Sequence, residues 1–100
     1  MKDLIITVIE IKGNCPVYKI GNKIFLDEGY KVNLSKTDAV CMHSLASILP
    51  YYNALSMGIK AKELGLAKKN GDQDKAYLHC LDPCEFTNGG TVIFEVEVLV

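Results

Sequence analysis

Four cysteines and two histidines are the residues of this chain that could carry chemistry. Thiolate and imidazole groups are the ligands of zinc, of copper and of iron–sulfur clusters. The local spacing is poor for such a site, because Cys80 and Cys84 are separated by three residues and Cys15 stands alone. It does not match the paired Cys-x-x-Cys of a zinc ribbon. A metal site in this chain therefore depends on which side chains the fold brings together.

The predicted metal ligands are those expected at or near strand ends, where loops can gather them: Cys15, Cys80, Cys84 and His79. Their ion would be zinc or another thiophilic metal. His79 and Cys80 point to opposite faces if both lie in a strand, which weakens this set. Structural or incidental cysteines are the alternative interpretation.

Cys41 is expected to be a small buried hydrophobic residue rather than a ligand. It lies on the apolar stripe of a predicted helix together with Leu45. His43 lies about 200° around that helix from Cys41, so the two side chains cannot easily bind one ion. Both are therefore left out of the predicted metal set.

A further hypothesis makes Cys15 a nucleophile. A thiol in a loop after a strand can be exposed, and a nearby histidine could activate it. No spacing rule supports a Cys–His pair in this sequence. The chain also contains no Gly-rich phosphate loop, no Ser-His-Asp order and no His-Glu-x-x-His motif. The sequence therefore leaves open whether the protein is an enzyme.

One long helix is predicted over residues 35–58. Its apolar side chains recur at spacings of three and four, which is typical of a helix with one buried face. They are Cys41, Leu45, Ile48, Leu49, Tyr52 and Leu55. We expect this stripe to pack on a sheet.

The ends of this helix carry recognisable signals. Ser35 and Asp38 fit a capping box, and Thr37 is a rival N-cap. Gly58 can adopt the left-handed conformation that ends a helix. Pro50 removes one backbone donor inside the segment, which predicts a kink or two short helices.

The segment before the helix is predicted to form strands. Residues 4–11 are apolar on both faces until Glu10, which is typical of a central strand. Residues 23–27 and 30–34 flank Glu28-Gly29 and indicate a tight hairpin.

The segment after the helix is predicted to contain two more strands. Residues 59–69 form either a short helix or an ordered loop, and residues 75–81 can form a strand. Residues 91–100 alternate, with one apolar face made of Val92, Phe94, Val96 and Val98. Together these patterns predict one α+β domain over residues 1–100, with a small antiparallel or mixed sheet and one main, Pro-kinked helix on one face.

Composition excludes some classes of partner. The net charge is −1 and all 11 basic residues are lysine, so nucleic-acid binding is disfavoured. No stretch approaches the ~20 apolar residues of a membrane span, and the N-terminal apolar run lacks a signal-peptide cleavage site. We expect a cytoplasmic protein with reduced thiols. Apolar residues make up 49% of the chain, which favours a homo-oligomer with apolar surface left for a small ligand or a partner protein.

The order of several short motifs resembles a family of small, uncharacterised cysteine-containing proteins found largely in anaerobic prokaryotes. The motifs are Cys15-Pro16, Gly21-Asn22-Lys23-Ile24-Phe25, Cys41-Met42-His43-Ser44-Leu45, Leu49-Pro50-Tyr51, Cys80-Leu81-Asp82-Pro83 and a final Val-Ile-Phe-Glu-Val strand. The likeness covers nearly the whole chain and resides in the order of the motifs. It implies no established activity.

The chain departs from the pattern of that family at several positions. Val17-Tyr18 stands where glycine and histidine often occur, Asn22 replaces the usual aspartate, and Leu81 replaces a proline. Cys84 has no counterpart in that pattern. These departures weaken any role carried over from the family to Cys15, Cys41 or Cys80.

Two classes of function follow. The first is a non-catalytic binding or interaction module that self-associates as a homodimer. The second is a thiol-dependent metal-binding or redox protein that uses Cys15, Cys80 and Cys84.

Overall fold

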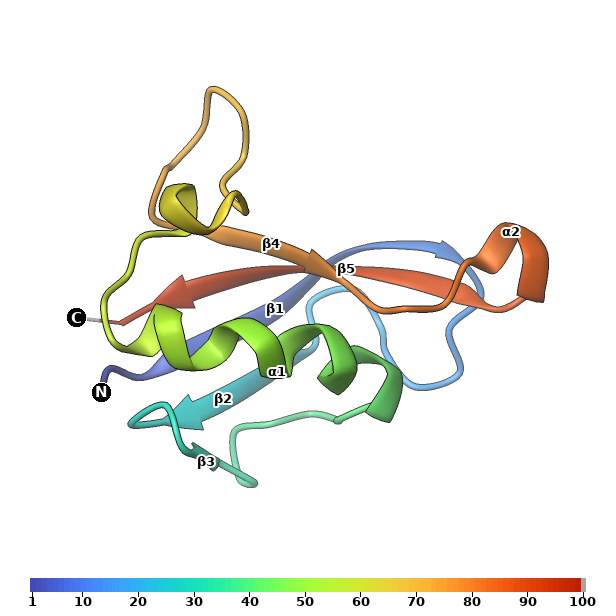
Figure 1. The fold of residues 1–100 in the computed structure, drawn as a ribbon. Helices are drawn as coiled ribbons and strands as arrows, with labels where there is room; N and C mark the ends of the chain where they lie inside the picture. Colours follow the sequence, from blue (N-terminus) through green and yellow to red (C-terminus); the bar gives the residue numbers. More distant parts are fainter. Residues whose placement is uncertain (100) are drawn as a thin grey trace.

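The computed structural model describes residues 1–99. Five strands form one antiparallel sheet in the order β3-β2-β1-β5-β4, and the long helix α1 crosses one face of it (Figure 1). The elements are β1 (Leu4–Gly13), β2 (Lys23–Asp27), β3 (Lys31–Val32), α1 (Met42–Ser56), the 3-10 helix η1 (Ala61–Leu64), β4 (Ala76–His79), α2 (Cys84–Thr87) and β5 (Gly90–Val98). The predicted α+β class is confirmed. No helix within residues 1–99 is both long enough and apolar enough to cross a bilayer.

The first strand occupies the centre of the sheet, as its apolar sequence predicts. It pairs with β2 from Leu4 to Thr7 and with β5 along its whole length. A bulge lies between Val8 and Glu10, and β1 and β5 continue as a two-stranded arm to the pair Gly13–Gly90. The arm extends past the ends of β2 and β4 toward α2 (Figure 1).

The core lies between the sheet and α1. Alternate residues of the central strands fill it and are at most 2% exposed: Leu4, Ile6, Val8, Val92, Phe94 and Val96. Ile48 and Leu55 reach it from the helix. The alternation predicted for β5 is therefore confirmed, and Glu95 lies on the other face, where the Tyr77 hydroxyl donates to it.

The helix begins later than predicted, so the expected start at Ser35 is wrong. Its N-cap is Cys41, which has extended backbone angles and makes no side-chain capping bond. Thr37 Oγ1 instead accepts from the Phe25 N–H, and Asp38 Oδ2 accepts from the Lys23 N–H. These two side chains bind β2 where the two-residue strand β3 is too short to pair with it.

The predicted end of the helix is confirmed. Gly58 has φ +96°, its N–H donates to the Leu55 carbonyl, and the Ile59 N–H donates to the Ala54 carbonyl. This pair of bonds is a Schellman motif. Pro50 lies within one uninterrupted helix, so the alternative of two short helices is wrong.

Several other segments are shorter than the sequence predicts. Residues 59–69 contain η1, whose C-cap is Gly65 with φ +73°, and an isolated bridge from Ala67 to Ala76. The strands expected over 30–34 and 75–81 shrink to β3 and β4. The Cys80 N–H still donates to the Val92 carbonyl, so β4 stays tied to β5 for one more residue.

Candidate functional site

Three of the four cysteines line one cavity of about 260 Å³, which we call the thiol cavity. It lies where the β1–β5 arm leaves the sheet, between the loop after β1, the start of α1 and the end of β4. Its cysteines are Cys15, Cys41 and Cys80; its other lining residues are Pro16, Val17, Tyr18, His43, Asp82, Gly90 and Val92. The walls are thus mainly sulfur and apolar groups.

Cys15 is held by the loop that follows β1. Its Sγ accepts hydrogen bonds from the N–H groups of Val17, at 3.4 Å, and Tyr18, at 3.3 Å. Pro16 has no N–H of its own and restricts the turn, so the chain folds back with two donors directed at one sulfur. Backbone N–H groups directed at sulfur are a recurrent outer-sphere feature of metal–thiolate centres.

Cys80 follows β4 directly and is 4% exposed. Its Sγ accepts from the Val92 N–H at 3.2 Å and lies 3.5 Å from the Gly90 carbonyl oxygen, to which the thiol donates. Gly90 also lies close against the Cys15 segment. A Cβ at this position would lie 2.6 Å from the Cys15 nitrogen. The missing side chain of Gly90 therefore lets the two segments meet.

Tyr18 ties Cys41 into the same site. The Cys41 N–H donates to the Tyr18 hydroxyl oxygen at 2.8 Å, and the Ser44 hydroxyl donates to the Cys41 carbonyl at 2.6 Å. The remaining contact, 2.7 Å between Tyr18 Oη and Ser44 Oγ, must then have the tyrosine as donor. Burial raises the pKa of Tyr18 above its ordinary value of 10.0, so the hydroxyl stays protonated to still higher pH than usual.

The aromatic ring of Tyr18 packs against the core residue Phe94. It meets Phe94 edge to face, with 5.5 Å between ring centroids and an interplanar angle of 85°. Such pairs stabilise one orientation of both rings. The cavity wall is thus continuous with the centre of β5.

The structure brings together two of the four predicted metal ligands, Cys15 and Cys80. Cys84 begins α2, where its N–H donates to Thr91 Oγ1, and it does not line the cavity. His79 lies on the opposite face from Cys80, as predicted, and its Nδ1 donates to the Cys80 carbonyl at 2.6 Å. Within residues 1–99 no group of three His, Cys, Asp or Glu side chains is already arranged to hold a metal ion. The metal ion stays a prediction.

Cys41 is the site residue that the sequence reasoning missed. Helical periodicity places it on the buried stripe and turns His43 away from it. Because Cys41 is the N-cap, it lies outside the helix, and both residues reach the thiol cavity. Cys41 is the last residue before the helical run, and an N-cap at that position would have placed it outside the helix.

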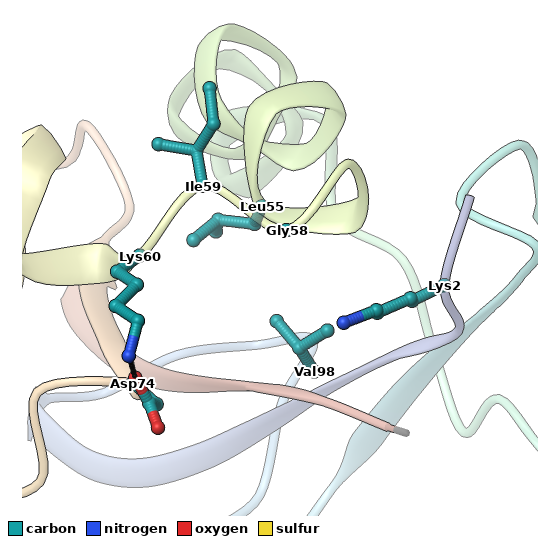
Figure 2. A pocket seen from close by; sticks show the side chains of 7 residues that line it. All are labelled: Lys2, Leu55, Gly58, Ile59, Lys60, Asp74 and Val98. Carbon is teal, nitrogen blue, oxygen red and sulfur yellow. Dashed lines mark ion pairs between the residues drawn. The ribbon is translucent and has the colours of Figure 1, made fainter.

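A second cavity, of about 230 Å³, lies near the C-terminal end of α1 (Figure 2). Lys60 pairs with Asp74 at 3.5 Å on one side of it, and the Lys2 ammonium points in from the other side. A lysine suits this place, because the carbonyl end of a helix carries partial negative charge. Its lining includes no thiol or imidazole, so the thiol cavity is the better candidate for chemistry.

Comparison of the chain with protein-family models, with curated proteins and with solved structures finds no match. The resemblance to the cysteine-containing family therefore stays a prediction.

Proposed function

We propose that the protein is a non-catalytic binding protein whose thiol cavity holds a small thiophilic ligand. The observation that carries this proposal is the meeting of Cys15, Cys41 and Cys80, from three separate segments, around one space. A volume of about 260 Å³ lies just under the usual range for small-molecule pockets, ~300–1,000 Å³. It suits an ion or a ligand of few atoms.

The contacts of the sulfurs favour binding over nucleophilic catalysis. An activated nucleophile is oriented by a base within hydrogen-bond reach. The acceptor contacts of Cys15 Sγ are instead to the N–H groups of Val17 and Tyr18, and His79 donates to the Cys80 carbonyl. The two contacts of Cys15 Sγ are thus with backbone N–H groups and not with an imidazole.

A cytoplasmic location is part of the proposal. All four cysteines are free thiols. The cytosol keeps thiols reduced, so they stay available there for a thiophilic ligand.

The proposal is tested by titrating the reduced protein, without oxygen, with two thiophilic probes, Cd²⁺ and phenylarsine oxide. We expect at least one of them to bind at one per chain and to protect Cys15 and Cys41 from iodoacetamide, as read by peptide mass spectrometry. Cys15→Ser should abolish the protection of Cys41. Cys84→Ser is the matched control and should bind as the unmodified protein does. Neither probe binding, or binding that survives Cys15→Ser, would contradict the proposal.

Self-association is the second part of the proposed function. An apolar groove between α1 and the β2–β3 edge is lined by Tyr30, Val32, Leu45, Leu49 and Tyr52, among others. Tyr30 is 74% exposed and Leu49 is 58% exposed. Large apolar side chains gathered at such a groove favour a protein contact, and we propose that a second copy of this chain covers it.

Leu49→Glu should convert the proposed dimer to a monomer, because it places a charge in the apolar contact. Sedimentation velocity over a range of concentrations measures the change. Ile20→Glu alters another exposed apolar residue outside the groove and should leave the dimer intact. A protein that sediments as a monomer at every concentration rules the dimer out.

A further inference from the structure

We infer that a groove between α1 and the outer edge of β4 binds an extended peptide segment of a partner protein, in which an apolar residue is followed by acidic residues. The groove is separate from the thiol cavity and its lining contains no cysteine. The inference therefore goes beyond the proposed function and does not depend on it.

The strand wall of the groove carries unpaired backbone groups. β4 is an edge strand, so β5 pairs with only one of its two sides (Figure 1). On that side the Cys80 N–H donates to the Val92 carbonyl, and on the outer side the Tyr77 N–H donates to the Leu66 carbonyl. Backbone groups of successive strand residues point to alternate sides, so the N–H and carbonyl of His79 point outward. Within residues 1–99 neither group has a hydrogen-bond partner on that side.

The helix wall has a backbone acceptor that lacks its usual donor. Pro50 has no N–H, so it cannot donate to the Ala46 carbonyl four residues earlier in α1. Both residues line the groove, whose volume is about 340 Å³. The other lining residues are Ser47, Tyr51, Leu66, Tyr77, Leu78 and His79. The lining thus contains no lysine, aspartate or glutamate, and an uncharged group fits it best.

A peptide backbone supplies both the donor and the acceptor that His79 lacks. One residue of an antiparallel peptide, placed opposite His79, exchanges two hydrogen bonds with it. The next peptide residue then lies opposite Leu78 and points to the α1 side of the sheet, because successive side chains of a strand alternate. An apolar side chain at that position enters the groove. Addition of a strand to a sheet edge is a recurrent mode of peptide recognition.

Charges next to the groove favour acidic residues in the following part of the peptide. The antiparallel peptide runs from His79 toward Leu66, which lies beside Tyr77 on the outer side of β4. A neighbouring depression of about 440 Å³ borders the segment around Leu66 and is lined by Lys62, Lys68 and Lys69. Neither ion pair found within residues 1–99 involves these three lysines. Carboxylates at this end of the peptide complement their charge.

A second copy of the chain does not fit the groove in this way. If two β4 edges paired with His79 opposite His79, the residue directed into the groove would be Cys80 of the other copy. Cys80 is 4% exposed and is held in its own fold by the Val92 N–H. The occupant is therefore a separate peptide segment.

The test is selection of a random heptapeptide library, displayed on phage, against the reduced full chain. We expect enriched sequences in which an apolar residue is followed by aspartate or glutamate. An enriched peptide is then synthesised with a fluorescent label, and its binding is measured by fluorescence anisotropy. Ala46→Glu places a charge in the groove wall and should weaken binding, whereas Asn53→Glu, on the same helix but outside the groove, should not.

The backbone pairing is tested at His79. His79→Pro removes the outward N–H, which an edge strand tolerates, and should weaken peptide binding by about 10-fold or more. His79→Ala keeps that N–H and is the matched control, which should bind the peptide normally. Circular dichroism shows whether each variant is folded. If His79→Pro unfolds, a peptide N-methylated at the residue before its apolar one tests the same pairing, because it cannot donate to the His79 carbonyl.

Several outcomes overturn the inference. A selection that enriches no sequence rules out the peptide site, and so does a peptide that binds Ala46→Glu as well as the unmodified chain. Binding that survives both His79→Pro and N-methylation excludes pairing with β4. Enrichment of lysine in place of the acidic residues contradicts the assigned charge. A dimer that is lost in Ala46→Glu, with no enriched peptide, assigns the groove to a second copy instead.

Discussion

Phe94→Ala is expected to lower the free energy of unfolding by about 3–5 kcal/mol, the usual cost of emptying a buried aromatic site. Phe94 is 0% exposed, lies at the middle of β5 and supports the Tyr18 ring. Domains of this size have about 5–15 kcal/mol of stability in all, so the variant should be close to unfolding. Urea denaturation followed by circular dichroism measures the change.

Phe86→Ala is the matched control for this prediction. The same atoms are removed, but Phe86 lies on α2 and is 90% exposed. Exposed substitutions usually change stability by no more than about 0.5 kcal/mol. Equal losses in the two variants would show that β5 does not form the centre of the core.

Gly90→Ala is expected to destroy ligand binding in the thiol cavity and to cost about 1–3 kcal/mol of stability, the usual range for overpacking. The new Cβ would lie 2.6 Å from the Cys15 nitrogen and 2.7 Å from the Asn14 carbonyl carbon. Both are backbone atoms, and pairing between β1 and β5 fixes this end of the arm, so no flexible side chain can give way. The Cys15 segment must move away from Cys80.

The Cd²⁺ titration and urea denaturation measure these two effects together. Gly71→Ala is the control, because its Cβ would meet only the side chain of Lys68 in an exposed loop. It should bind Cd²⁺ normally and unfold at nearly the same urea concentration. Normal Cd²⁺ binding by Gly90→Ala would mean that the close approach at Gly90 does not shape the site.

The strands were predictable because their signals are local. The alternation of Val92, Phe94 and Val96 and the apolar run of residues 4–11 depend only on neighbours in the chain, and both are confirmed. Gly58 was predictable for the same reason, since glycine takes at little steric cost the left-handed conformation that ends many helices.

The start of the helix was not predictable in this way. Thr37 and Asp38 are good caps by type, but the unpaired edge of β2 takes their hydrogen bonds instead. That edge is unpaired because β3 is so short, which depends on tertiary structure. The error at the helix start then carried over to the site, because helical spacing places the side chains of Cys41 and His43 about 200° apart.

The candidate site could be predicted only in part. Cys15 and Cys80, which both follow strands, line one cavity, whereas Cys84 and His79 do not. The opposite directions of His79 and Cys80 follow from strand geometry. Two contacts between residues far apart in the sequence bring the cysteine segments together. Gly90 allows a close approach to Cys15, and the Tyr18 hydroxyl accepts from the Cys41 N–H. The local spacing of residues in the sequence does not predict contacts of this kind.

The Tyr18–Cys41 hydrogen bond joins residues that are 23 positions apart, and Cys80 joins them only after β4 and β5 have paired. A partly folded chain in which one of these segments has not yet packed therefore contains the cysteines but lacks the thiol cavity. Only fully folded molecules then have the cavity. A ligand that bound there would stabilise the complete fold relative to every partly folded state.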